Sequence, residues 1–99
     1  MTKTGGLSNL KEKDDIVKEL ILSINDSLIN KLILCKEDII SIHSYKTQIV
    51  AGIIFFLKIT INNKCYHIKI INYLPHTNKS PELLSIQTDK NINDDITFF

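Results

Sequence analysis

The stretch YKTQIVAGIIFFLKITI, residues Tyr45–Ile61, decides the fold. It is rich in β-branched and aromatic residues, and its second half alternates polar with apolar side chains, as half-buried strands do. As one strand, its 17 residues would span about 56 Å, which is too long for a domain of this size. The small residues Ala51 and Gly52 interrupt the bulky run. We therefore expect the chain to turn near Gly52 and return as an antiparallel hairpin.

The segment before this stretch predicts a helix. Its apolar residues recur in steps of three and four, which places them on one face of a helix. They are Val17, Leu20, Ile21, Ile24, Leu28 and Leu32. Asp14 or Asp15 can cap the start, where a carboxylate also suits the helix dipole. A helix over residues 15–32 would be about 27 Å long.

Further strands are expected on both sides of the hairpin turn. We predict them over Ile39–Gln48 and Ile53–Ile61, with Asn62-Asn63 as the next turn because Asn tolerates positive φ. In the strand that follows, three apolar side chains alternate with three others, which predicts a half-buried strand. The first set is Tyr66, Ile68 and Ile70, and the second is Cys65, His67 and Lys69.

The chain ends in a break and one more short strand. Leu74-Pro75-His76-Thr77-Asn78 breaks the pattern, because proline cannot donate to a central ladder, and Leu83–Thr88 predicts the last strand. The economical packing is α+β: one long α-helix across an antiparallel meander of four longer strands. Residues 1–99 then form a single domain, with the polar residues 1–13 as a flexible N-terminal arm.

Composition limits the partners and the compartment. The chain has 99 residues with 12 basic and 11 acidic side chains, and all the basic ones are lysines. Without arginine there is no bidentate fork for phosphate or guanine, so we expect no nucleic-acid partner. The longest uncharged apolar run, Ile49–Leu57, is about half a membrane span, and the N-terminus lacks the apolar core of a signal peptide. Two cysteines are too few for a secreted disulfide framework, which favours a reduced, cytoplasmic protein without a membrane partner.

No catalytic motif stands out. Cys35 and Cys65, with three histidines, invite a thiol-protease interpretation, but neither cysteine follows a glycine-bearing turn at a helix start. Cys65 and His67 share a strand face and could supply two metal ligands, yet no second ligand pair follows at finger-like spacing. We expect no enzyme activity, no metal and no cofactor. A thiol enzyme built on Cys65 and His67 remains as an alternative, which thiol reactivity would test.

The predicted hairpin tip carries unusual residues. Most tight hairpin turns contain Asn-Gly or Asp-Gly with polar flanks. Here Ile49 and Val50 accompany Ala51 and Gly52, so apolar side chains should face water. Exposed apolar loop tips are more often binding surfaces than accidents.

Three motifs, in order, resemble those of the stefins, the type 1 cystatins. They are Gly5-Gly6-Leu7, the pentapeptide Gln48-Ile49-Val50-Ala51-Gly52, and Leu74-Pro75-His76. The similarity continues through Tyr45-Lys46-Thr47 and Gln87-Thr88-Asp89-Lys90-Asn91, so it covers essentially the whole chain. The family pentapeptide usually has Val where Ile49 stands. One extra residue just before Tyr45 is expected to shift a bulge.

The resemblance implies the cystatin fold, a strongly bent antiparallel sheet of up to five strands on one helix, with a short first strand near Leu7. It also implies reversible, tight inhibition of papain-like (cathepsin-type) cysteine proteases by a three-part wedge. In that wedge Lys3 and Thr4 would occupy the non-primed subsites, with Gly5, followed by Gly6, as the hinge of the arm. Gln48–Gly52 would lie beside the catalytic thiol, and Leu74, Pro75 and His76 would contact the primed side.

Two questions stay open at this level. A cystatin fold could also serve as a non-inhibitory interaction or scaffold protein, although a lost wedge would be expected in that case. The protein is expected to be a monomer, and whether exchange of the first hairpin produces domain-swapped dimers is undecided.

Overall fold

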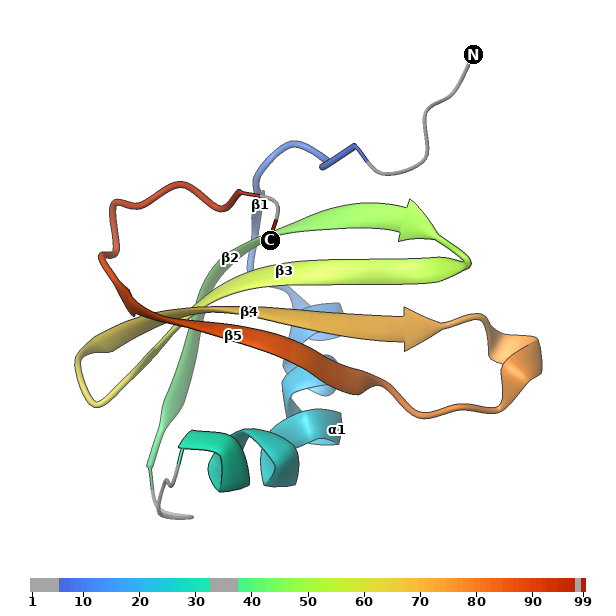
Figure 1. Cartoon of the computed structure of the whole chain (residues 1–99), viewed down its shortest axis with the longest axis horizontal. Coiled ribbons are helices and arrows are strands. Elements are labelled where there is room, and N and C mark those ends of the chain that lie inside the picture. Colours follow the sequence, from blue (N-terminus) through green and yellow to red (C-terminus); the bar gives the residue numbers. More distant parts are fainter. Residues whose placement is uncertain (1–5, 33–37, 98) are drawn as a thin grey trace.

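The computed structural model describes residues 6–32, 38–97 and 99, and within them it has one α-helix and five strands. The elements are β1 (Lys11–Glu12), α1 (Asp15–Leu32), β2 (Ile40–Val50), β3 (Gly52–Ile61), β4 (Lys64–Tyr73), the 3₁₀ turn η1 (Pro75–Thr77) and β5 (Glu82–Lys90). All strand pairs are antiparallel, and the strands lie side by side in chain order (Figure 1). This confirms the predicted α+β class, with a helix packed on an antiparallel sheet.

Helix α1 has the bounds that the apolar spacing predicts, and it covers one face of the sheet. Its buried residues are Val17, Leu20, Ile21, Ile24 and Leu28. They pack into one core with apolar side chains of β2, β3 and β4. The capping prediction is also confirmed, because the Val17 N–H donates to Asp14 Oδ1 at 3.2 Å.

Asp14 also joins the helix start to the sheet. The Tyr45 hydroxyl donates to Asp14 Oδ2 at 2.6 Å, across 31 residues of chain. This hydrogen bond is the main cause that lowers the pKa of Asp14 and raises the pKa of Tyr45 to about 12. The contact fixes where α1 enters the fold relative to β2.

The predicted turns are confirmed. Val50 pairs with Gly52 at the end of the β2–β3 hairpin, so the reversal centres on Ala51. Asn62 and Asn63 take φ values of 52° and 65°, the positive φ expected of that turn. The β2–β3 register shifts between Ile42 and Ser44, immediately before Tyr45, where the extra residue was expected.

The N-terminal predictions need correction. The first strand lies at Lys11–Glu12, opposite Tyr45 and Ser44, and not near Leu7. Before it, the Ser8 N–H donates to the Thr47 carbonyl at 2.8 Å, and the Thr47 N–H donates to Ser8 Oγ at 2.9 Å. Residues 8–12 are therefore anchored along β2 and are not part of a flexible arm, because the backbone groups of β2 need partners on that side. Residues 1–5 of the predicted arm lie outside the described residues.

The second face of the sheet is covered too, by residues 91–97 and 99, which we name the C-terminal segment. It leaves β5 and returns toward β2 (Figure 1). Three lysines hold its backbone: Lys46 Nζ donates to the Ile96 carbonyl at 2.9 Å, Lys58 Nζ to that of Ile92 at 2.8 Å, and Lys69 Nζ to Phe99 O at 2.5 Å. Ile96, within this segment, is buried.

This cover overturns one detail of the sequence analysis. Strand β4 is not half-buried, because Cys65 and His67 are buried on the face away from α1. Residues 91–97 were given no element in the sequence analysis, so nothing there predicted what would lie over those two side chains.

Candidate functional site

Two connections meet at one end of the sheet. Gly52, which follows the β2–β3 turn, pairs directly with Tyr73, the last residue of β4. Leu74 follows Tyr73 and begins the connection to β5. The strand register therefore places the turn Val50–Gly52 beside the start of the Leu74–Asn78 connection, as the right-hand end of the sheet in Figure 1 shows.

The first turn exposes apolar side chains, as predicted. Ile49 is 68% exposed and Val50 is 36% exposed. Sequence reasoning missed Ile53, which is also exposed and pairs directly with Ile49 across the hairpin. The sequence contained the signal for this pair, because a reversal at Ala51 puts the residues two positions before and two positions after it on the same face of the hairpin. The turn thus carries a cross-strand apolar pair beside its tip.

Gln48 and Gly52, at the ends of the pentapeptide, differ from the three residues between them. Gln48 is only 7% exposed, and Gly52 is buried. Gly52 has a φ of +133°, and a Cβ placed there would lie 2.7 Å from the Asn72 carbonyl oxygen. No residue with a side chain fits, because the backbone conformation and the close strand both exclude it. Gly52 therefore shapes the turn through its contact with β4.

The second connection is held by its own hydrogen bonds. The Thr77 N–H and hydroxyl both donate to the Leu74 carbonyl, at 3.0 and 2.7 Å. Asn78 ends η1 with a φ of 55°, and its N–H donates to the Pro75 carbonyl at 3.2 Å. Leu74, Pro75 and His76 are exposed on this ordered turn. The predicted residues of the second loop thus form an accessible surface next to the first turn.

The N-terminal residues approach the same end. Ser8 is bonded to Thr47, three residues before Val50. Gly6 is exposed, and a Cβ there would meet no atom within 4 Å. Lys3, Thr4 and Gly5 lie outside the described residues, so their predicted contacts stay predictions.

Cys65 and His67 lack the features of an activated thiol. Their side chains lie on the same face of β4, and both are buried. Burial raises the pKa of the Cys65 thiol and lowers the pKa of His67. A nucleophilic pair needs the opposite, a thiolate stabilised by an imidazolium. This arrangement speaks against the alternative of a thiol enzyme at these residues.

Within residues 6–32, 38–97 and 99, no three His, Cys, Asp or Glu side chains gather as metal ligands. Likewise, no helix in that part of the chain has the length and apolarity needed to cross a membrane.

Comparison with known proteins identifies relatives along the whole chain. The family model of the cystatin domain matches residues 36–93. Cystatin-A2 of Dictyostelium discoideum is 33% identical over 99 residues, which cover 100% of both chains. Cystatin-A1 of Sus scrofa is 32% identical over 96 residues, 96% of this chain and 92% of the relative. Cystatin-B of Mus musculus is 40% identical over 65 residues, 65% of this chain and 66% of the relative.

Proposed function

The chain belongs to the cystatin family, in its stefin branch, and we propose that it inhibits papain-like, cathepsin-type cysteine proteases reversibly by filling their active-site cleft. Cystatins are cysteine protease inhibitors and not enzymes. Our proposal adds the class of protease, the wedge and the residues that form the wedge.

One observation carries it: exposed apolar side chains occupy two adjacent turns at one end of the sheet. Ile49 and Val50 are on the first turn, and Leu74 and Pro75 are on the second. A protein that binds nothing there gains no stability from such residues, because they leave apolar surface in water. Buried in a cleft, the same surface would supply the binding free energy.

We propose a separate role for each part of the wedge. Ile49, Val50 and Ala51 lie at the tip and would enter the cleft nearest the catalytic thiol, with Leu74, Pro75 and His76 on the primed side. Lys3, Thr4, Gly5 and Gly6 would run along the non-primed side. Gln48 and Gly52 act differently, because both are buried in the unbound chain. They would hold the shape of the tip and leave the contact to the residues between them.

Rigidity favours tight and reversible binding. The first turn is closed by paired strands, and the second by the hydrogen bonds of Thr77 and Asn78. Little conformational entropy is therefore lost on docking. Ile49–Ala51 and Leu74–His76 include no Asp, Glu, Lys or Arg, so association would rest on apolar burial and shape and not on electrostatic steering. Inhibition without cleavage follows if no peptide carbonyl of the tip reaches attack geometry at the thiolate.

We also propose that the protein works in the cytoplasm as a monomer. The buried Cys65 thiol carries no disulfide, which suits a reducing compartment. Exchange of the β2–β3 hairpin between two chains remains open, and size-exclusion chromatography over a range of concentrations would detect it.

The experiment that tests the function is a titration against a panel of papain-like proteases, with serine proteases as controls. We expect stoichiometric inhibition of the first group, full recovery of activity on dilution, and an inhibitor of unchanged mass. Inhibition through a cleaved or covalently bound product would contradict the mechanism. Failure to inhibit any papain-like protease would favour a non-inhibitory interaction or scaffold role for this fold.

A further inference from the structure

A row of polar side chains lies on the sheet face away from α1, and two of them, Lys58 and His67, are buried. The register places Lys58 of β3 opposite His67 of β4, and His67 opposite Gln87 of β5. His67 is 0% exposed. Among the described residues, neither of its ring nitrogens nor Gln87 Oε1 has a hydrogen-bond partner. Such an imidazole is unusual, because most buried polar groups are hydrogen-bonded.

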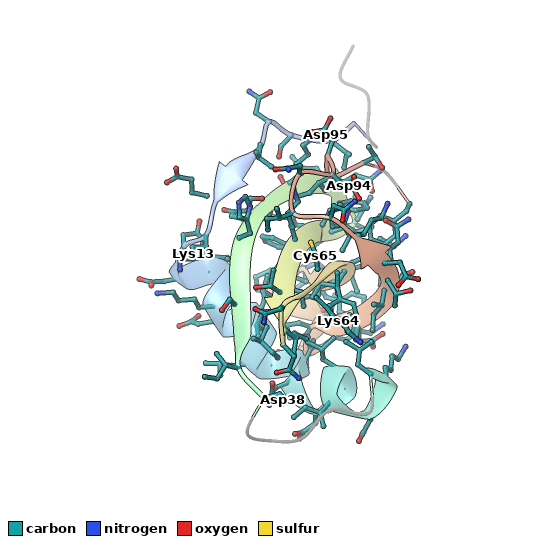
Figure 2. All side chains as sticks on the ribbon, turned by 90° about the vertical axis from the view of Figure 1, so that its left-hand side faces the viewer. Lys13, Asp38, Lys64, Cys65, Asp94 and Asp95 are labelled. Atoms are coloured by element: carbon teal, nitrogen blue, oxygen red, sulfur yellow. The ribbon has the colours of Figure 1, made fainter. Side chains whose placement is uncertain are left out.

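The C-terminal segment contacts this row at Lys58. Its Ile92 carbonyl accepts from Lys58 Nζ, on the strand beside His67. Next to it, Asn91 and Asp94 close a small turn: the Asp94 N–H donates to the Asn91 carbonyl, and the Asn91 N–H donates to Asp94 Oδ2, both at 2.9 Å. Figure 2 looks toward the end of the sheet opposite to the Val50–Gly52 turn. It shows the Cys65 sulfur below the loop that carries Asp94 and Asp95. Movement of this segment would open a route for water to His67.

The charges around His67 oppose a proton on its ring. Lys58 on β3 and Lys90 on β5 are the cations that face it, and Asp94 in the C-terminal segment is the anion. Lys46 and Lys69 are on the same sheet face, where they bind carbonyl oxygens. Burial, followed by Lys90 and Lys58, lowers the pKa of His67, and Asp94 only partly offsets this. The covered state therefore holds a neutral imidazole.

We propose that His67 is an acid-sensitive latch, and that protonation of its ring releases the C-terminal segment from the sheet while the core under α1 stays folded. The segment can leave one face of the sheet without disturbing the other, because the core against α1 is formed by different side chains. The core cluster against α1 includes residues of β2, β3 and β4 but none of the described C-terminal residues. The proposal is independent of protease binding and goes beyond the proposed function.

The direction of the pH effect follows from linkage. The pKa of His67 is lowered in the covered state and returns to about 6.5 when the segment opens. Below that pH the open state binds more protons than the covered state, so acid favours opening. From pH 7.5 to pH 5.5 the opening equilibrium constant should rise, with a limit of about tenfold set by the open-state pKa, and above pH 7.5 it should be constant.

Cys65 provides the reporter, since its thiol is buried on the same face as His67. The experiment uses the full chain with Cys35→Ser, so that Cys65 is the single thiol. Its rate of reaction with a dithiodipyridine, a reagent that also reacts in acid, is divided by the rate in the urea-unfolded chain at the same pH. We expect this ratio to rise from pH 7.5 to pH 5.5, by up to about tenfold. Hydrogen exchange in α1 should stay slow throughout.

The matched variant is His67→Phe, which keeps an aromatic ring but cannot titrate. Its ratio should be constant over the same pH range, and His67→Gln should behave likewise if the Phe variant does not fold. A constant ratio in the parent chain would overturn the proposal. So would a rise that persists without His67 and disappears in Asp94→Asn, because Asp94 would then be the sensor. Exchange in α1 that accelerates together with Cys65 labelling would show global unfolding and would also overturn it.

Discussion

The two ends of strand β3 reverse the chain in opposite ways. At one end, Asn62 and Asn63 are exposed, polar and in positive φ, which is what a connection needs if it only turns the chain. At the other end, Ile49 and Ile53 form an exposed apolar pair beside a turn that depends on Gly52. The same strand thus has one turn with exposed polar side chains, which water solvates well, and one with exposed apolar side chains, which water solvates poorly. This difference supports our proposal that the apolar end binds the protease.

The strand order strengthens this contrast. The apolar turn lies beside the Leu74–Asn78 connection because Gly52 pairs with Tyr73. The turn at Asn62 and Asn63 joins the far ends of β3 and β4, so it lies away from both connections. Changes at the two ends should therefore have different effects: loss of binding at one, and loss of stability alone at the other.

The largest effect is expected from Val50→Asp. A charge at this tip would be buried without a partner in the proposed complex, at a cost of about 3–5 kcal/mol. Inhibition of papain-like proteases should therefore weaken by more than about a hundredfold. Val50 is partly exposed in the unbound chain, so the melting temperature should hardly change. Inhibition assays and thermal melts on one preparation measure both.

The control for that variant is Asn62→Asp, which places the same charge at the opposite turn. It should inhibit like the parent chain. If Val50→Asp inhibits normally, the central role proposed for the β2–β3 turn is wrong. If it unfolds, Val50 belongs to the core.

Gly52→Ala tests whether the apolar turn also depends on its backbone. The new Cβ would lie 2.7 Å from the Asn72 oxygen at a φ of +133°, so the free energy of unfolding should fall by about 1–3 kcal/mol. In a domain of this size that corresponds to a loss of about 4–8 °C in Tm per kcal/mol. Ala51→Gly is the matched control, with a change below about 1 kcal/mol. An unchanged Tm in Gly52→Ala would mean that the strand contact is looser than described.

Removal of residues 1–5 measures how much the third part of the proposed wedge adds to the binding affinity of the apolar end. We expect inhibition to weaken by roughly tenfold, about 1.4 kcal/mol, because ordering a polar segment offsets part of the contact it gains. Most of the change should be in the dissociation rate, measured by stopped-flow or surface binding. Equal inhibition constants for several proteases before and after truncation would exclude a binding role for this segment.

The smallest effect is expected from Asn63→Ala, at the polar turn. Ala tolerates a φ of 65° less well than Asn, so the free energy of unfolding should fall by about 1 kcal/mol. Inhibition should stay at the parent level, since the turn is remote from the proposed contact surface. A loss of inhibition without a loss of stability would remove the functional difference between the two ends of β3.

Much of the candidate site could be predicted because its signals are local. The tip was located by one glycine in an apolar run, and the second turn by one proline. Ile53 was missed because its role depends on which residue faces Ile49, and that is a matter of register. The burial of Gln48 was missed for the same reason, since a polar residue next to a turn gives no local sign of what covers it.

The sequence by itself determined the helix over residues 15–32, the turns at Ala51 and Asn62-Asn63, and the order of the strands. These follow from periodicity and from the φ values that single residues tolerate, which act over a few positions of chain. Only the tertiary structure decided that Ser8 and Lys11 lie along β2, and that His67 is buried under the C-terminal segment. Those contacts join residues about 30 to 50 positions apart through backbone carbonyls and lysine side chains. Every residue type offers a carbonyl, so no pattern in the sequence marks which one a lysine will bind.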